Sequence, residues 1–504
     1  MTYQSPDANT IKSLASELGL KLDDAGARRM ESLLGGFAAG YQFLDQTADE
    51  LPVPSPRSRA WNRPLPRENQ YGAWAVKTSI RSGQQGVLSG KRIVVKDNIS
   101  VAGIPMANGT AMLADFIPES DAEAVRRLLE AGAEIVGKSV CEFMCLSGGS
   151  GTSASGPVQN PHKPGYSTGG SSSGSAALVA VGEVDGALGT DQGGSVRIPA
   201  SWTGVVGMKA TRGVVPYAGA VVMETSIDYI GPLTPDVERN AMLLEVLAGA
   251  HQDNETLSPG YDRSYRAQLG QPLRGLRIGV LAEGFDNPAG ERDVDECVRA
   301  ATGVLQKLGA VIVPASVPEH AWGVGVWGAV VTDGFWNTLN LGGLGYNYEG
   351  AYSPALHERM VNWREHFASM PENAHMLMLL GKHLEQYRGK YYGKAKNMVH
   401  RLTAAYDRAL ACHDLLLLPT TVKKSQPNPV PGAPDYADEL ISQAMGNTIN
   451  CASFNATGHP ALSIPCGTRA GLPVGMMLVG RMYSEALIYR VAHAFEQQVN
   501  WKQR

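Results

Sequence analysis

Strand-like and helical runs alternate between about residue 70 and residue 240 of this 504-residue chain. Short β-branched or apolar runs bounded by glycine and polar residues are typical of buried strands. Such alternation favours a mostly parallel or mixed β-sheet covered by helices, which is an α/β fold. The predicted strands are Arg92–Val95, Glu134–Val136 and Gly186–Gly189, and the predicted helices are Asp121–Glu130 and Ser175–Val181.

The pattern continues in the second half of the chain. Leu276–Leu281 and Ala310–Val313 predict two more strands, with a helix over Asp293–Leu308 between them. Asp414–Thr420 contains four consecutive leucines and predicts a late central strand. Residues 320–440 are the least constrained, and their Trp-, Tyr- and Met-bearing segments fit a variable substrate entrance as well as a core or an interface.

The first 65 residues differ from the rest. Apolar side chains recur at helical spacing over Ile11, Leu14, Ala15 and Leu18, and Gly19 can end that helix. Ala25–Leu44 predicts a further helix, and the proline cluster Leu51–Pro56 resembles a linker. We therefore expect residues 1–65 to form a small helical appendage used for packing or dimer contacts, ahead of a main domain over residues 66–504.

Two Gly-Gly-Ser units, ending at Ser171 and Ser195, lie 24 residues apart with an apolar run between them. Glycine allows close backbone approach, and a serine presented after it can act as a nucleophile beside backbone N–H donors. The flexible-linker interpretation is disfavoured, because linkers are not normally flanked by buried-looking helix and strand. Upstream, a β-branched run ends in Lys96, which gains significance only in combination with these serines.

These motifs resemble the amidase-signature family, the Ser–cis-Ser–Lys hydrolases, and within it the bacterial amidases that act downstream of nitrile hydratases. The resemblance implies a large mixed β-sheet with helices on both faces, and it makes residues 66–504 the catalytic domain. The matching segments occur in order from about residue 70 to about residue 480. They are Val95–Asn98, Gly169–Ala176, Gly189–Ala200, Gly204–Lys209, Gly231–Leu233, Phe454–Pro460 and Gly471–Gly475.

The resemblance assigns a role to each catalytic candidate. Ser195 matches the nucleophile, Ser171 matches the bridging serine whose preceding peptide bond is cis in the family, and Lys96 matches the base. A lysine has an ordinary pKa of about 10.4, so it accepts a proton at neutral pH only if burial lowers that value. The backbone N–H groups of Gln192, Gly193, Gly194 and Ser195 are expected to form the oxyanion hole.

Several neighbours are expected to support this site. Asp191 and Arg197 flank the nucleophile and fit a loop-holding ion pair, and Ser172 can donate a hydrogen bond nearby. Ser173 stands where the family commonly has glycine. The residues expected to line the substrate pocket are Cys145, Leu146, Ile227 and Trp327.

Other motifs predict no further chemistry. Gly132–Ser139 satisfies the P-loop pattern, but a P-loop follows a strand and opens a helix, whereas here a predicted helix precedes a strand. His459 lies in a Thr-Gly-His-Pro turn and is interpreted as structural. The six cysteines are scattered, which favours reduced thiols over a metal site. We expect no metal and no cofactor.

Composition narrows the expected partners. The net charge of −4 gives no electrostatic reason to bind nucleic acid or an anionic membrane. Neither a signal peptide nor a run of about 20 apolar residues is present, so a cytoplasmic location is expected by default. The family suggests a homodimer.

The leading hypothesis is an amidase that converts a small carboxylic acid amide to acid and ammonia through an acyl-serine intermediate. Anilides, carbamates, hydrazides and esters stay open as substrates, because one acyl-serine mechanism serves them all. A component of a glutamine-dependent amidotransferase is a less favoured alternative. A noncatalytic binding protein is disfavoured, because Lys96, Ser171 and Ser195 are all present.

Overall fold

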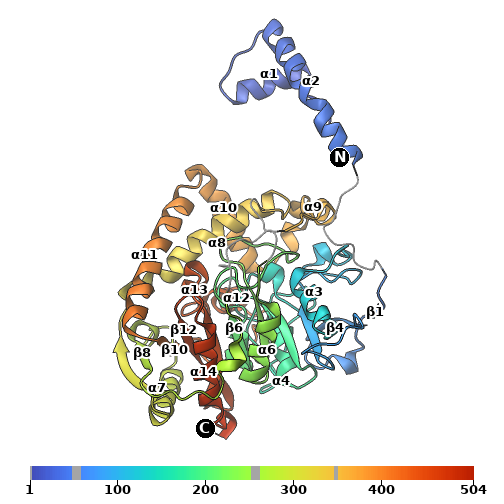
Figure 1. Ribbon diagram of the computed structural model, residues 1–504. Helices are drawn as coiled ribbons and strands as arrows, with labels where there is room; N and C mark the ends of the chain where they lie inside the picture. Colours follow the sequence, from blue (N-terminus) through green and yellow to red (C-terminus); the bar gives the residue numbers. More distant parts are fainter. Residues whose placement is uncertain (1–2, 48–57, 251–260, 346–349, 504) are drawn as a thin grey trace. The chain divides into compact units, whose positions relative to one another are not determined.

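The computed structural model describes residues 3–47, 58–250, 261–345 and 350–503. The chain divides into two compact units, Met1–Val53 and Pro54–Arg504 (Figure 1). The proline cluster Leu51–Pro56 lies outside the described residues.

The smaller unit contains two helices, α1 (Ala8–Glu17) and α2 (Asp24–Gln46), at the positions predicted from helical spacing. Each is preceded by a capping aspartate, Asp7 or Asp23, whose carboxylate accepts a backbone N–H of the first turn. Gly19 follows α1 with a φ of 80°, a left-handed conformation that glycine adopts without strain. Few side chains of this unit are buried, and Leu18 and Phe37 are among several large apolar ones that are exposed.

The larger unit is built on one mixed sheet, in which twelve strands lie within the described residues. Their order is β1-β2-β4-β3-β5-β7-β6-β11-β12-β10-β8-β9. The strands are β1 (Trp61–Asn62), β2 (Trp74–Ile80), β3 (Arg92–Lys96), β4 (Glu134–Ser139), β5 (Gly186–Thr190), β6 (Val206–Lys209), β7 (Ile230–Thr234), β8 (Arg277–Leu281), β9 (Val311–Ala315), β10 (Leu415–Pro419), β11 (Ala461–Arg469) and β12 (Leu472–Gly480). Because β1 pairs with β2, the larger unit begins earlier than the predicted boundary after residue 65.

Helices cover both faces of this sheet (Figure 1). Along β3, Ile93 and Val95 pack into one apolar cluster with α3 and α6, whereas Val94 packs into another with α4. This alternation follows from the two-residue period of a strand. The helices of the larger unit are α3 (Glu123–Glu130), α4 (Ser173–Ala180), α5 (Arg197–Thr203), α6 (Val237–Leu247), α7 (Arg292–Lys307), α8 (Gly323–Asn340), α9 (Pro354–Met360), α10 (Glu372–Leu384), α11 (Lys390–Cys412), α12 (Tyr436–Gly446), α13 (Ala452–Thr457) and α14 (Glu485–Glu496).

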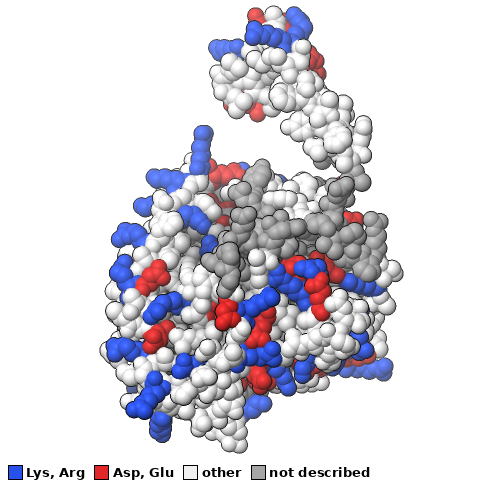
Figure 2. Space-filling model, viewed as in Figure 1, with Lys and Arg blue, Asp and Glu red and all other residues white. Residues whose placement is uncertain are grey.

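Residues 320–440 combine sheet and helices. The four leucines of β10 are fully buried, as expected for a strand covered on both faces. Helix α8 contacts both α10 and α11, and these helices form a separate apolar cluster that also contains Phe143 and Trp363. On the face of the larger unit drawn in Figure 2, acidic and basic side chains are interspersed.

Candidate active site

Lys96 is the last residue of β3 and is completely buried. Its Nζ donates hydrogen bonds to Ser171 Oγ and Thr190 Oγ1, each at 2.8 Å, and to the Thr190 carbonyl at 3.3 Å. Strands β3 and β5 are parallel neighbours, so their carboxyl ends, Lys96 and Thr190, meet at one edge of the sheet. The pairing of these two strands therefore positions the lysine.

Ser171 lies in a loop before α4, and its bond to Gly170 is a cis peptide. A side chain at Gly170 would collide with the carbonyl oxygen of Gly149, 2.0 Å from its Cβ position, so only glycine fits there. The N–H of Glu142 donates to the Ser171 carbonyl at 3.2 Å. These close backbone contacts hold the Ser171 hydroxyl against the lysine.

Ser195 and Ser172 are joined through the backbone. The Ser172 N–H donates to the Ser195 carbonyl at 3.2 Å, and Ser172 Oγ donates to the Thr190 carbonyl, also at 3.2 Å. The loop that carries Ser195 therefore lies beside the loop that carries Ser171. The structure brings Lys96, Ser171 and Ser195 into one region, although the two serines come from different turns.

Asp191 organises the loop around Ser195. Its carboxylate accepts hydrogen bonds from the N–H groups of Gly194 at 2.6 Å and Val196 at 3.1 Å. It also pairs with Arg197 at 2.9 Å, and both side chains are fully buried. Burial alone would raise the pKa of Asp191, but the guanidinium of Arg197 holds it well below its usual range. Asn455, from α13, donates from its Nδ2 to the backbone carbonyl and to the carboxylate oxygen Oδ1 of Asp191, each at 2.8 Å.

The expected oxyanion hole needs one correction. The Gly194 N–H is committed to Asp191, so it is not available to a substrate oxygen. Within the described part of the chain, the N–H groups of Gln192, Gly193 and Ser195 have no backbone acceptor. These three are the expected donors that have no backbone acceptor among the residues that the structure describes.

Trp327, on α8, contacts the same turn. Its indole N–H donates to the Gln192 carbonyl at 2.6 Å. Its ring covers Gly193 so closely that a Cβ there would lie 2.6 Å from Trp327 Cζ2. Trp327 is one of the residues expected to line the pocket, but nothing in the sequence indicates this bond.

The four expected pocket residues fall into one apolar cluster. Cys145, Leu146, Ile227 and Trp327 all belong to it, and all are buried. Cys145 also contacts a partner of the lysine, because its Sγ lies 3.7 Å from Thr190 Oγ1.

A polar network that the sequence did not indicate extends from the lysine. Thr190 and Asn98 approach within 3.4 Å, and Asn98 in turn contacts the Tyr217 hydroxyl. Gln192 Nε2 donates to that hydroxyl at 3.0 Å. Thr190 and Gln192 lie inside the family motif Gly189–Ala200, so the motif could have indicated that they belong to the site. No sequence motif indicates Tyr217.

The remaining motifs have structural contacts. Lys138 lies within β4, after α3, and forms a buried ion pair of 3.2 Å with Asp97, which matches the helix-then-strand order expected there. His459 Nε2 and Asp407 Oδ1 lie 3.1 Å apart, and burial lowers the pKa of His459 to about 4. All six cysteines are free thiols. Within the described residues, no helix is long and apolar enough to cross a membrane.

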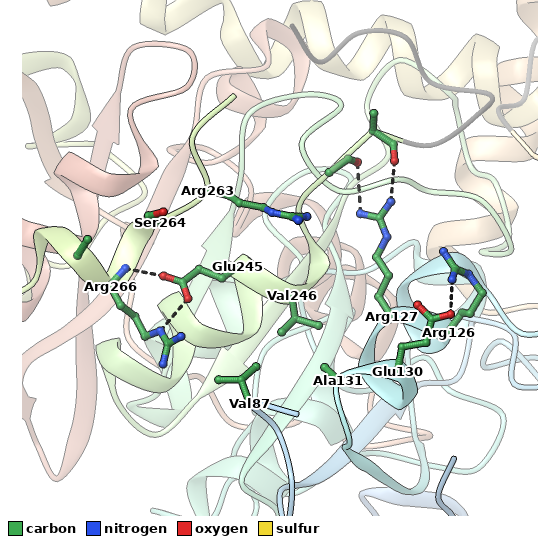
Figure 3. A pocket seen from close by; sticks show the side chains of 13 residues that line it. Val87, Arg126, Arg127, Glu130, Ala131, Glu245, Val246, Arg263, Ser264 and Arg266 are labelled. Carbon is green, nitrogen blue, oxygen red and sulfur yellow. Dashed lines mark hydrogen bonds and ion pairs between the residues drawn. The ribbon is translucent and has the colours of Figure 1, made fainter. Parts of the chain in front are cut away.

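A separate cavity of about 790 Å³ lies between α3, α6 and the segment after residue 260 (Figure 3). Four arginines line it, and each already has a partner. Arg126 pairs with Glu130, Arg266 pairs with Glu245, and Arg127 donates to the carbonyls of residues 247, 249 and 250. Arg263 donates to the carbonyl of residue 248. The cavity shares no lining residue with the site around Lys96.

The similarity of the chain to known proteins identifies its family. A sequence model described as Amidase matches residues 55–489. The chain belongs to the amidase family. An enantioselective amidase from Rhodococcus rhodochrous is 41% identical over 98% of this chain and 96% of that protein.

Two further relatives of this amidase differ in their described roles. A component of a glutamyl-tRNA(Gln) amidotransferase from Synechococcus sp. (strain CC9902) is 31% identical over 93% of this chain and 94% of that protein. The solved structure of a peptide amidase from Stenotrophomonas maltophilia superposes with a TM-score of 0.67 at 29% identity, covering 82% of this chain and 83% of that one. The amidase-signature resemblance and the α/β fold are confirmed, and the enzyme is an amidase. The amidotransferase alternative is not favoured, because the higher identity is to an amidase.

Proposed function

We propose that this amidase hydrolyses a small carboxamide to the acid and ammonia through an acyl intermediate on Ser195. The observation that carries the proposal is the fully buried contact of 2.8 Å between Lys96 Nζ and Ser171 Oγ, next to the loop of Ser195. An unprotonated amine in this position is a general base without any histidine. Thr190 holds the lysine from the other side, which keeps its Nζ directed at Ser171.

The proposed reaction moves one proton along this chain. Ser195 Oγ attacks the amide carbonyl carbon while its proton passes to Ser171 Oγ, and the proton of Ser171 passes to Lys96 Nζ. The proton then returns by the same path to the leaving nitrogen, and ammonia departs from the acyl-enzyme. A water molecule next attacks the ester carbonyl with the same base, which releases the acid and restores Ser195.

The oxyanion of each tetrahedral intermediate is proposed to bind the N–H groups of Gln192, Gly193 and Ser195. Trp327 supports this arrangement through the peptide between residues 192 and 193. Because a trans peptide is planar, fixing the Gln192 carbonyl on the indole directs the Gly193 N–H to the opposite side. A carbonyl that accepts a hydrogen bond also polarises its own peptide, so the Gly193 N–H becomes a stronger donor.

The pocket favours an apolar acyl group. Its proposed walls, Cys145, Leu146, Ile227 and Trp327, present mainly carbon and sulfur. We therefore propose primary amides of aromatic or branched aliphatic acids as the substrates, with anilides, carbamates, hydrazides and esters as alternatives. The enantioselectivity in the name of the Rhodococcus rhodochrous relative supports testing chiral amides first.

Intact-protein mass spectrometry during turnover tests the mechanism. Wild type is mixed with an aliphatic amide, benzamide, glutamine and a carbamate, and released ammonia is followed in parallel. A transient acyl adduct that is lost in Ser195→Ala is expected. The matched control is Ser175→Ala, a buried serine of the same segment whose hydroxyl donates to the Leu188 carbonyl, and it should keep the adduct. Unchanged ammonia release by Ser195→Ala would refute the mechanism.

We also propose that the helices of residues 1–65 mediate a homodimer; the absence of nucleic-acid partners and the cytoplasmic location remain predictions. The support is the exposure of large apolar side chains on α2, which a second copy would cover: Phe37 and Phe43 are each 66% exposed. Light scattering on the full chain tests this. Phe37→Glu with Phe43→Glu should give a monomer, whereas Gln42→Glu, a charge added at a neighbouring exposed position, should not.

A further inference from the structure

Two thiols that the proposed mechanism does not use lie together beside the catalytic lysine. Cys141 follows β4, and Cys145 ends a short 3₁₀ turn, Phe143–Cys145. Both Sγ atoms approach the same acceptor, Asn108 Oδ1, at 3.8 Å and 3.6 Å. They form a pair rather than two isolated cysteines.

The segment between the two cysteines contacts the catalytic residues directly. It contains Glu142, whose N–H donates to the Ser171 carbonyl and whose carboxylate accepts from Ser173 Oγ at 2.8 Å. Cys145 itself lies 3.7 Å from Thr190 Oγ1, the same hydroxyl oxygen that accepts from Lys96. Any covalent change at the pair therefore acts on the groups that hold Ser171 and Lys96.

A small cavity reaches one thiol of the pair, Cys141. It has a volume of about 130 Å³, and its walls include Cys141, Asp97 and Trp74. A water molecule occupies about 30 Å³ of liquid, so a hydroperoxide of similar size has room there. Cys145 does not line this cavity, but it keeps 6% of its surface exposed, so a small oxidant has a route to each thiol without unfolding of the site.

The two thiols differ in acidity. Burial opposes ionisation of both, but the polar neighbours of Cys145, Cys141 first among them, lower its pKa to about 6. Burial and the neighbouring Cys145 raise the pKa of Cys141 well above its usual value. A thiolate next to a protonated thiol is the combination that reacts with peroxides and then resolves to a disulfide.

We propose that Cys141 and Cys145 are a peroxide-responsive site whose oxidation to a disulfide switches off amide hydrolysis. The Cys145 thiolate attacks one oxygen of a hydroperoxide, the O–O bond breaks, and a sulfenic acid and a hydroxide or alkoxide form. Cys141 sulfur then attacks the Cys145 sulfur, the S–O bond breaks, and water leaves with the thiol proton. Two thiols are oxidised and one hydroperoxide is reduced to water, or to water and an alcohol.

Closing this disulfide removes the Cys145 thiol from Thr190 and tightens the segment that carries Glu142. Both changes displace supports of Lys96 and Ser171, so the amidase should lose activity when the bond forms and regain it on reduction. This consequence rests on the proposed function, whereas the disulfide itself does not.

The test treats the full-length protein with hydrogen peroxide and measures thiol mass and ammonia release together. The expected result is the loss of two hydrogens on the proteolytic fragment that carries both cysteines, with activity falling at least about tenfold and returning with dithiothreitol. In Cys141→Ser, Cys145 should oxidise further to sulfinic acid, which dithiothreitol does not reverse. Cys145→Ser should resist peroxide at the same dose.

Two controls keep the outcome interpretable. Cys412→Ser removes an exposed thiol far along the chain, at the end of α11, and should be inactivated at the wild-type rate. Cys297 and Cys466 form a second buried thiol contact of 4.0 Å, so fragment mapping must distinguish the two pairs. The proposal is overturned if the Cys141–Cys145 fragment keeps both hydrogens while activity is lost, or if Cys145→Ser is inactivated like wild type. A disulfide that forms without loss of activity would overturn the switch but leave the proposed amidase mechanism intact.

Discussion

Replacing Trp327 by phenylalanine isolates the hydrogen bond of its indole from the packing of its ring. Phenylalanine keeps an aromatic ring near Gly193 but loses the 2.6 Å bond to the Gln192 carbonyl. Removing an entire oxyanion-hole donor costs about 100- to 1000-fold in kcat. In Trp327→Phe the Gly193 N–H remains, and only its orientation and polarisation by the indole are lost. We therefore set the loss of transition-state stabilisation at the net contribution of one hydrogen bond, about 1 kcal/mol. We therefore expect kcat to fall about five- to tenfold.

Steady-state ammonia release with a simple amide measures this effect, with kcat and KM determined separately. KM should change less than kcat, because the lost bond is made to the enzyme's own backbone and matters most when the oxyanion forms. The matched control is Trp336→Phe, which removes an indole bond of 3.1 Å to Glu385 from the same helix and should leave kcat unchanged. An unaltered kcat in Trp327→Phe, or an equal loss of kcat in Trp336→Phe, would show that the Trp327 indole does not orient the oxyanion hole.

Three further substitutions test other contacts of the site. Asp191→Asn leaves Arg197 buried without a counter-charge and should cost about 3–5 kcal/mol of unfolding free energy in a denaturant titration. Gly193→Ala should lower kcat at least as much as Trp327→Phe, because its Cβ would overlap the indole; steady-state rates check this. Burial raises the pKa of Glu142 from 4.5 to about 7 in the folded protein. As pH rises through this range, Glu142 ionises in the unfolded chain before it ionises in the folded protein, so the free energy of unfolding falls. Glu142→Gln cannot ionise, so its melting temperature should rise relative to wild type between about pH 5 and pH 7.

The strands and the helices that line the sheet could be predicted because their signals are local. The β-branched run ending at Lys96 and the glycine-bounded run before Thr190 each indicate a strand without any knowledge of the other. The family motif then supplied the pairing of Lys96 with Ser171. The expected ion pair of Asp191 and Arg197 also rested on residues close in sequence, and the structure contains it.

Contacts between distant segments were not predictable in the same way. Asn455 bonds Asp191 across 264 positions, and no spacing rule connects two such residues. Gly194 was expected in the oxyanion hole from the family resemblance, but the direction of a single N–H depends on the turn formed around Asp191. The boundary after residue 65 was misplaced because β1 is only two residues long, too short to give an alternation signal.

The dependence of the Ser195 loop on Asn455 has a consequence during synthesis of the protein. Lys96, Ser171 and Ser195 have all left the ribosome long before α13 exists. The ion pair of Asp191 and Arg197 nevertheless gains its hydrogen bonds to residues 451 and 455 only when those residues are in place. Strand β11, which joins β6 to β12, is also made after that point. A nascent chain therefore carries every reacting group without an assembled site, so that hydrolytic activity begins only when the last tenth of the chain has folded onto the rest.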